Sequence, residues 1–411
     1  MNKLRWLAIL SGVSFVFLAL GPVGTDGGPQ KRQKARKAPA TPASISFPVG
    51  SITAITEPMI RQVVQRRDDN RGNIVFMGKI AGNVDGFQAR STLRAGMSGM
   101  AQGWASLESV SISGTHFVGV YRQMAGGFYD LEIRPTYRNQ VGASSTVFAV
   151  GVGEVFLTAG QSNSTNAGPA YGFVPDLRVS SFVDGTGHGT DPAYPNAGWR
   201  WGIDPQPTLD GTFGSSVWPR MASNLAAALN VPVGLYSLGY YSTSIDQWQP
   251  GATITTPTNS QASLFVRLIH AVNYFKYRSG VRAVLWDQGE SDTALKTNPV
   301  VYEARLRALI DLSRQLTGVP VKWMVATATG PPGTDPSYQP LLEQAQANVV
   351  DESATFTGPD TDRLGYEYRQ SPPNGFPYHF NVEGVRRLGD LWGIYIYNWP
   401  GFLAPGELPP H

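Results

Sequence analysis

The second half of the chain alternates between short apolar runs and longer segments of helical periodicity. The runs expected to form strands span residues 155–160, 231–238, 283–286 and 321–327. The segments expected to form helices span residues 215–229, 260–277, 299–316 and 341–350, and a last one follows residue 379. Alternation of strands and helices predicts a parallel sheet covered by helices on both faces.

Residues 45–150 show a different pattern, in which short alternating segments are separated by glycine, asparagine and aspartate. Examples are residues 73–80, 109–121, 128–134 and 145–150, and only residues 57–65 have the character of a helix. Strands at this spacing predict a small β-sandwich-like domain ahead of the α/β part. Such a domain could bind carbohydrate or shape a cleft. We favour a packing module, because a sandwich by itself does not indicate a function.

The first 44 residues have the character of an export segment and a linker. Lys3 and Arg5 precede an uncharged apolar run at residues 6–21, which is typical of a signal peptide or an N-terminal anchor. Residues 22–44 are rich in proline, alanine, lysine and arginine and predict a solvated basic linker. We therefore expect a periplasmic, secreted or envelope-anchored protein, with the N-terminal segment as its route to membrane association.

The net charge of +3 belongs to this early segment. Seven of the 33 basic residues and one of the 30 acidic residues precede residue 41, so the remaining chain has 26 basic and 29 acidic residues. Because no basic stripe persists beyond the linker, we expect no nucleic-acid partner.

Residues 155–163, with the sequence VFLTAGQSN, end an apolar strand in a turn of small and polar residues. A turn at the carboxyl edge of a parallel sheet is where open α/β folds bind ligands. Ser162 is therefore the candidate nucleophile. The alternative is a strand followed by an ordinary polar turn.

Two distant segments add to this motif. Residues 284–292, VLWDQGESD, form another apolar strand that ends in carboxylates, and residues 379–392, HFNVEGVRRLGDLW, begin with a histidine before a helix-like stretch. The three segments resemble the GQSN, WxQGExD and late-histidine blocks of the sialate O-acetylesterase and carbohydrate esterase family 6 branch of the SGNH hydrolases. The resemblance covers about residues 151–400. It implies an SGNH-type, flavodoxin-like three-layer α/β/α esterase domain over residues 151–405, with residues 45–150 as a β-rich accessory domain.

The resemblance implies that His379 is the general base of a serine esterase. The other histidines are His116 in an expected strand, His188 in a glycine-rich loop, His270 on an expected helix and His411 at the terminus. A serine nucleophile needs such a base to take its proton. The alternative is that His379 only caps the following helix.

Three donors are expected to form the oxyanion hole. The first is the backbone N–H of Ser162. Residues 241–248, YSTSIDQW, resemble the family's GGTSxxxW block, with Tyr241 and Ser242 in place of the two glycines. Ser242 can still donate its backbone N–H if its backbone angles permit. The side chain of Gln288 is the third donor.

The acid that orients His379 departs from the family pattern. SGNH enzymes commonly place an aspartate three residues before the histidine, where this chain has Phe376. Candidates to replace it are Glu290 in the QGESD turn and Asp360 or Asp362 in GPDTD, and we favour Glu290. Asp292 is then structural, and Trp248 and Trp286 are expected to pack rather than react.

We expect neither a metal nor another cofactor. The chain has no cysteine, no HExxH motif and no histidine and aspartate cluster at ligand spacing, and no glycine-rich phosphate loop follows a strand. The sequence thus predicts an exported serine esterase that removes acetyl groups from sialic acid, xylan or an envelope polysaccharide through an acetyl-serine. The alternatives are an SGNH-type polysaccharide O-acetyltransferase and an inactive carbohydrate-binding protein.

Overall fold

The computed structural model describes residues 48–185, 189, 191–371 and 377–399. The predicted signal peptide or anchor, the predicted linker, His188, Phe376 and His411 lie outside these residues. Within the described ranges, no helix combines the length and the apolar character needed to cross a bilayer.

A mixed sheet with mostly parallel strands lies at the centre of the α/β part. Its strands are β10 (Ser145–Gly160), β11 (Val179–Val183), β12 (Gly198–Trp201), β13 (Val233–Ser237), β16 (Ala283–Asp287), β17 (Lys322–Thr327) and β18 (Thr355–Asp360). The order across the sheet is β12-β11-β13-β10-β16-β17-β18, and β12 is the antiparallel edge strand. The chain moves from β13 across β10 to β16, so β10 lies at the position where the direction of strand addition reverses. Open α/β sheets bind ligands at such a position, beyond the carboxyl ends of the strands.

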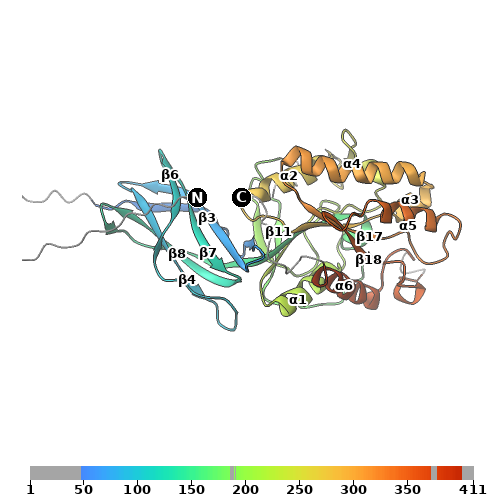
Figure 1. Ribbon diagram of the computed structural model, residues 1–411, viewed down its shortest axis with the longest axis horizontal. Coiled ribbons are helices and arrows are strands. Elements are labelled where there is room, and N and C mark those ends of the chain that lie inside the picture. Colours follow the sequence, from blue (N-terminus) through green and yellow to red (C-terminus); the bar gives the residue numbers. More distant parts are fainter. Residues whose placement is uncertain (1–47, 186–188, 190, 372–376, 400–411) are drawn as a thin grey trace, which may run out of the picture. The chain divides into compact units, whose positions relative to one another are not determined.

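Helices cover both faces of this sheet (Figure 1). On one face lie α1 (Trp218–Leu229) and α6 (Val382–Tyr397), and on the other lie α2 (Leu264–Lys276), α4 (Pro299–Thr317) and α5 (Gln339–Asn348). A short α3 (Glu290–Leu295) follows β16. Each long helix buries one apolar side against β-strand residues such as Val284 and Leu285, which point to opposite faces because strand residues alternate.

The region before residue 145 consists of strands without an α-helix among the residues described there. They are β1 (Ser51–Glu57), β2 (Val63–Gln65), β3 (Arg71–Ala81), β4 (Gly86–Leu93), β5 (Ala105–Ser106), β6 (Glu108–Ser113), β7 (His116–Ala125), β8 (Gly127–Tyr137) and β9 (Gln140–Val141). One sheet has the order β1-β3-β7-β6, whereas β8 joins β4 to the first half of β10. Side chains from both groups of strands share one core, which includes Phe76, Phe87, Phe117 and Leu131.

The predicted accessory domain is not confirmed as a separate unit. The described residues cluster as one compact unit. The predicted boundary at residue 150 falls within β10, whose first part pairs with β8 and whose second part pairs with β13 and β16. The division into an accessory domain and an esterase domain therefore stays a prediction.

One local prediction is wrong, and two strands were not expected. Residues 57–65 do not form a helix, because Glu57 ends β1, Arg61 has a positive φ of 64°, and Val63–Gln65 pair with β10. β-branched valines favour this sheet pairing. No strand was expected at residues 163–212, which contain β11 and β12. Both strands are short, and the serines inside β11 hide its apolar pattern.

Candidate active site

The ends of β10 and β16 meet at the carboxyl edge of the sheet. Gly160 lies opposite Asp287, and the backbone N–H of Gln161 donates to the Asp287 carbonyl at 3.0 Å. Gly160 has a φ of 135°, and a Cβ atom there would lie 2.0 Å from the Asp287 oxygen. Only glycine allows this approach, so the small residue before the serine joins the two motifs.

The side chain of Gln161 fixes one motif to the other. Its Oε1 accepts hydrogen bonds from the backbone N–H groups of Gly289 at 3.3 Å and Ser291 at 3.0 Å. From the opposite side, Trp218 of α1 donates to the Ser164 carbonyl at 2.8 Å. The turn that carries Ser162 is therefore held by both a strand motif and a helix.

Ser162 begins a 3-10 turn, η1 (Ser162–Ser164), and is 5% exposed. Among the described residues, neither its hydroxyl nor its backbone N–H forms a hydrogen bond, whereas the neighbouring Ser164 and Thr165 hydroxyls donate to backbone carbonyls. Ser162 therefore has both an unengaged hydroxyl and an unengaged amide, as a nucleophile with its own oxyanion donor requires.

Asn163 connects all three motifs. Its Nδ2 donates to Glu290 Oε1 at 2.6 Å and to the Tyr378 carbonyl at 3.1 Å. Ser162 precedes Asn163 in the chain, and His379 follows Tyr378. The structure therefore brings the segments that carry Ser162, Glu290 and His379 to one place.

His379 lies before α6 on a well-fixed backbone. Its carbonyl accepts from Gln370 N–H at 2.8 Å, and Asn381 caps α6 by accepting from Gly384 N–H at 3.0 Å. The cap of this helix is thus Asn381, not His379. Burial, aided by the charge of Arg369, lowers the pKa of His379, which favours a neutral imidazole at neutral pH.

Glu290 is the first residue of α3 and is 2% exposed. Burial raises its pKa, since only one of its oxygens is engaged: Oε1 accepts from Asn163, and Oε2 has no hydrogen-bond partner among the described residues. The direct Glu290–His379 hydrogen bond expected for a triad is therefore not formed in this structure. The role of Glu290 as the orienting acid stays a prediction.

The two alternative acids are used elsewhere. Asp362 accepts from the Thr329 N–H, the Thr329 hydroxyl and the Gly330 N–H, and burial raises its pKa to about 7. Asp360 ends β18 and pairs with Arg363 at 2.8 Å. Neither carboxylate forms a hydrogen bond to His379.

The two other oxyanion candidates differ in how they are held. Ser242 has a φ of 56°, the left-handed conformation that glycine adopts at no cost, and its backbone N–H has no partner among the described residues. Gln288 is fully buried, and its Nε2 donates to Asp292 Oδ2 at 2.5 Å and to the Thr243 carbonyl at 3.0 Å. For Gln288 to donate to an oxyanion, one of these bonds must break.

The packing predictions in this region are confirmed. Trp248 and Trp286 are both fully buried, with their rings edge to face at 5.1 Å. Asp292 is structural: its backbone carbonyl accepts from Thr297 N–H at 3.0 Å and closes the turn, and its side chain accepts from Ile245 N–H at 2.9 Å and anchors η2 (Ile245–Trp248).

Sequence reasoning missed three residues of the site. Asn163 and Asp287 lie inside the two recognised motifs, and their polar side chains at strand ends were the signal that could have found them. Asp287 is fully buried with no hydrogen-bond partner for either oxygen among the described residues. Burial and the neighbouring charge of Glu290 raise its pKa well above the ordinary value. The third, Arg369, had no motif to mark it.

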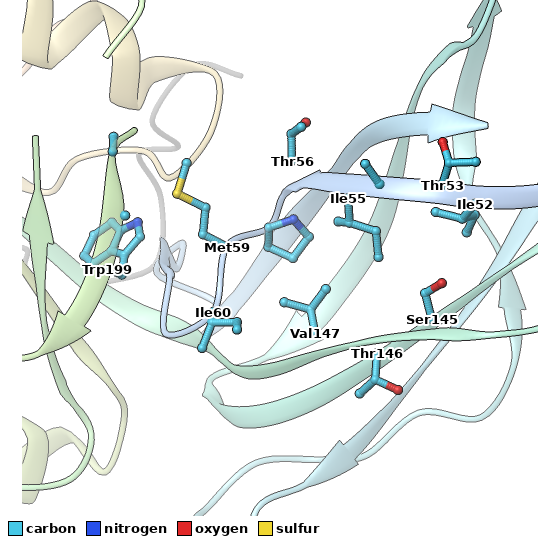
Figure 2. A pocket seen from close by; sticks show the side chains of 14 residues that line it. Ile52, Thr53, Ile55, Thr56, Met59, Ile60, Ser145, Thr146, Val147 and Trp199 are labelled. Carbon is cyan, nitrogen blue, oxygen red and sulfur yellow. The ribbon is translucent and has the colours of Figure 1, made fainter. Parts of the chain in front are cut away.

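A cavity of about 520 Å³ lies elsewhere, beside β1, the start of β10 and the start of β12. Figure 2 shows Met59 near Trp199 at one end of it and Thr53 and Ser145 toward the other. Its lining has no acid, base or charged side chain, so we do not place the chemistry there. Among the described residues, no group of three histidine or acidic side chains could hold a metal ion.

Comparisons with known proteins show the family of this chain. The family described as "Carbohydrate esterase, sialic acid-specific acetylesterase" matches residues 152–392, more than half of the chain. A solved carbohydrate acetylesterase from Xanthomonas citri is 19% identical with a TM-score of 0.54, over 85% of this chain and 76% of that one. It shares the fold.

Two other solved structures are less similar. A protein from Arabidopsis thaliana is 17% identical with a TM-score of 0.46, over 60% of this chain and 98% of that one. A family two carbohydrate esterase from Cellvibrio japonicus is 10% identical with a TM-score of 0.34, over 85% and 96%. A comparison with curated protein sequences found no match.

Proposed function

We propose that this chain, which belongs to the family of carbohydrate esterases described as sialic acid-specific acetylesterases, removes O-acetyl groups from a carbohydrate through an acetyl-serine intermediate. Family membership makes the protein a carboxylic ester hydrolase and implies an acetylated carbohydrate as its substrate. The observation that supports the mechanism best is the Asn163 amide, which bonds both Glu290 and the carbonyl next to His379.

In the proposed reaction, the Ser162 oxygen attacks the acetyl carbonyl carbon while His379 takes the serine proton. The backbone N–H groups of Ser162 and Ser242 stabilise the resulting oxyanion, because both are without other partners in the described structure. His379 then gives its proton to the departing sugar oxygen, which leaves acetyl-serine. Water, deprotonated by His379, releases acetate and restores the serine.

Glu290 supports the imidazolium in this proposal by its charge. Since its Oε1 bonds Asn163 instead of the imidazole, its effect on His379 passes through the electrostatic field and through the position of Asn163. The hydrogen bond between Ser162 and His379 forms when substrate binds, as catalytic hydrogen bonds often tighten only in the complex. Gln288 is the third proposed oxyanion donor.

The site and the N-terminal segment suggest where the reaction occurs. We propose export, because Lys3, Arg5 and the uncharged run at residues 6–21 are typical of a signal or an anchor. The candidate substrates are acetylated sialic acid, xylan and envelope polysaccharide. Acetate release from a panel of these glycans identifies the one that is used.

The deciding experiment is Ser162→Ala. We expect kcat for an acetyl ester to fall on the order of 10⁵ to 10⁶-fold with an unchanged melting temperature. Ser313→Ala is the matched control, because its buried hydroxyl donates to the Ile310 carbonyl in α4 and accepts from Trp323 Nε1 at 3.1 Å, and bonds none of the three site motifs. A serine-directed fluorophosphonate should label Ser162 alone. Near-wild-type turnover in Ser162→Ala, or labelling elsewhere, would remove the proposal, and acetyl transfer to sugar in place of acetate release would make the enzyme a transferase.

A further inference from the structure

Arg369 is a buried arginine with an unusual set of partners. It is 2% exposed, and its three nitrogens donate to backbone carbonyls: Nε to Leu364 at 3.1 Å, Nη1 to Tyr378 at 2.8 Å and Nη2 to Thr361 at 3.1 Å. The other deeply buried arginines, such as Arg282, bond a carboxylate directly. Burying a guanidinium without a bonded carboxylate is costly, so its position calls for a reason.

Arg369 contacts the residues on both sides of His379 in the chain. Its Nη1 bonds the carbonyl of Tyr378, the residue before the histidine, and its guanidinium lies 3.8 Å from the ring centre of Phe380, the residue after it. The backbones of Arg369 and Phe380 also form an antiparallel bridge, and Gln370 N–H donates to the His379 carbonyl. Both neighbours of the imidazole are therefore fixed by one side chain.

The same side chain is linked to the nucleophile's turn. The Tyr378 carbonyl accepts from Arg369 and also from Asn163, which follows Ser162 and bonds Glu290. The carboxyl groups of Glu290, Asp362 and Asp287 act electrostatically on Arg369, so one guanidinium lies among three buried acids. This arrangement gives Arg369 both a geometric and an electrostatic connection to the site.

We propose that Arg369 is a positioning residue that holds the imidazole of His379 beside Ser162 by fixing the residues on either side of it. The inference rests on the proposed function, since it takes His379 as the general base. Arg369 reaches the reaction only through His379. Its loss should therefore reduce kcat more than it changes KM, because substrate contacts remain in place.

Two variants separate geometry from charge. Arg369→Met removes both the hydrogen bonds to the carbonyls and the positive charge. We expect kcat to fall on the order of 10²-fold, as for a displaced catalytic group. The inflection in its pH profile of kcat/KM should also move to higher pH, because the positive charge that opposes protonation of His379 is gone. Arg369→Lys keeps the charge but not the planar fork. Its inflection should stay near that of the wild type while kcat falls about tenfold.

Arg314→Met is the matched control. Arg314 also donates to backbone carbonyls, those of Val321 at 3.1 Å and Ala354 at 2.9 Å, but at the amino ends of β17 and β18, the edge of the sheet away from Ser162. The Arg314→Met variant should have a lower melting temperature, with kcat and the inflection in the pH profile of kcat/KM unchanged.

The outcomes distinguish the two proposals. A kcat within threefold of wild type in folded Arg369→Met, or an unmoved inflection, overturns the positioning role while Ser162→Ala remains inactive. If Arg369→Met does not fold, Arg369→Lys decides, and wild-type kcat in that variant overturns the role. An active Ser162→Ala instead overturns the proposed function.

Discussion

Buried carboxyl groups at the two ends of the same sheet differ in their hydrogen-bond partners. At the amino side, Glu154 is fully buried and accepts from Arg66 at 2.7 Å, from Arg282 at 2.8 Å and from Gln65 at 2.9 Å. At the carboxyl side, Asp287 is as deeply buried but has no bonded partner among the described residues, and Glu290 has one engaged oxygen. Burial alone does not explain the difference.

The pKa shifts follow the partners. Burial by itself would raise the pKa of Glu154, but the charges of Arg282 and Arg66 lower it below the ordinary value. Burial raises the pKa of Glu290 and Asp287, since the guanidinium that acts on both, that of Arg369, bonds carbonyls instead. At the amino side, a bonded carboxylate therefore contributes to stability. At the carboxyl side, buried acids have raised pKa values, and this is where we propose the chemistry.

The largest expected effect on stability is at the amino side. Glu154→Gln removes the carboxylate that bonds Arg66 and one of the two carboxylates that bond Arg282, the other being Asp68, so unfolding by urea should show a loss of about 3–5 kcal/mol. Its kcat per folded molecule should remain within about twofold of wild type. Because the folded pKa of Glu154 is lowered, its contribution is present above the unfolded value of about 4.3 and is lost as pH falls toward the folded pKa. Wild-type stability should thus fall with acid more steeply than that of the variant, and equal slopes would contradict the pairing.

The second effect is at the carboxyl side, where the substitution should lower kcat and not stability. Glu290→Gln keeps an oxygen for Asn163 and removes a partly engaged buried charge, so stability should be unchanged or higher. We expect kcat to fall on the order of 10²-fold, about 2.7 kcal/mol, with KM little changed. This loss is smaller than the roughly 10⁴-fold of a directly bonded triad acid, because Glu290 does not bond His379. Asp360→Asn is the control, with less than about a twofold change, and an equal loss in both variants would argue against Glu290.

The smallest effect concerns the backbone at the same edge. Ser242 has a φ of 56°, so Ser242→Gly should keep kcat within about threefold and change stability by less than about 1 kcal/mol. The proposed oxyanion donor is a main-chain amide that both residues possess. Ser242→Val should cost about 1–3 kcal/mol, because a branched residue tolerates this conformation poorly. Both are measured by denaturant unfolding and initial rates. A valine variant as stable as wild type would show that the conformation is not required.

Much of the fold follows from local patterns. The expected strands at residues 231–238, 283–286 and 321–327 correspond to β13, β16 and β17, and the expected helices correspond to α1, α2, α4, α5 and α6. Periodicity identifies these elements because each has a continuous buried side. It fails for β18, whose sequence TFTGPD contains glycine and proline, and for β11, because sheet pairing there outweighs a weak local signal.

By itself, the sequence determined which three segments would carry the chemistry, because nucleophile, acid and base need particular residue types at strand and helix ends. It also identified Ser162 and His379 as the residues to test. Only the tertiary structure decided that Asn163 bridges Glu290 to Tyr378, that Glu290 does not bond His379, and that Arg369 lies among three buried acids. In each case, side chains from segments more than a hundred residues apart meet in the protein interior. There the neighbouring groups, and not the residue type alone, determine the pKa of each side chain.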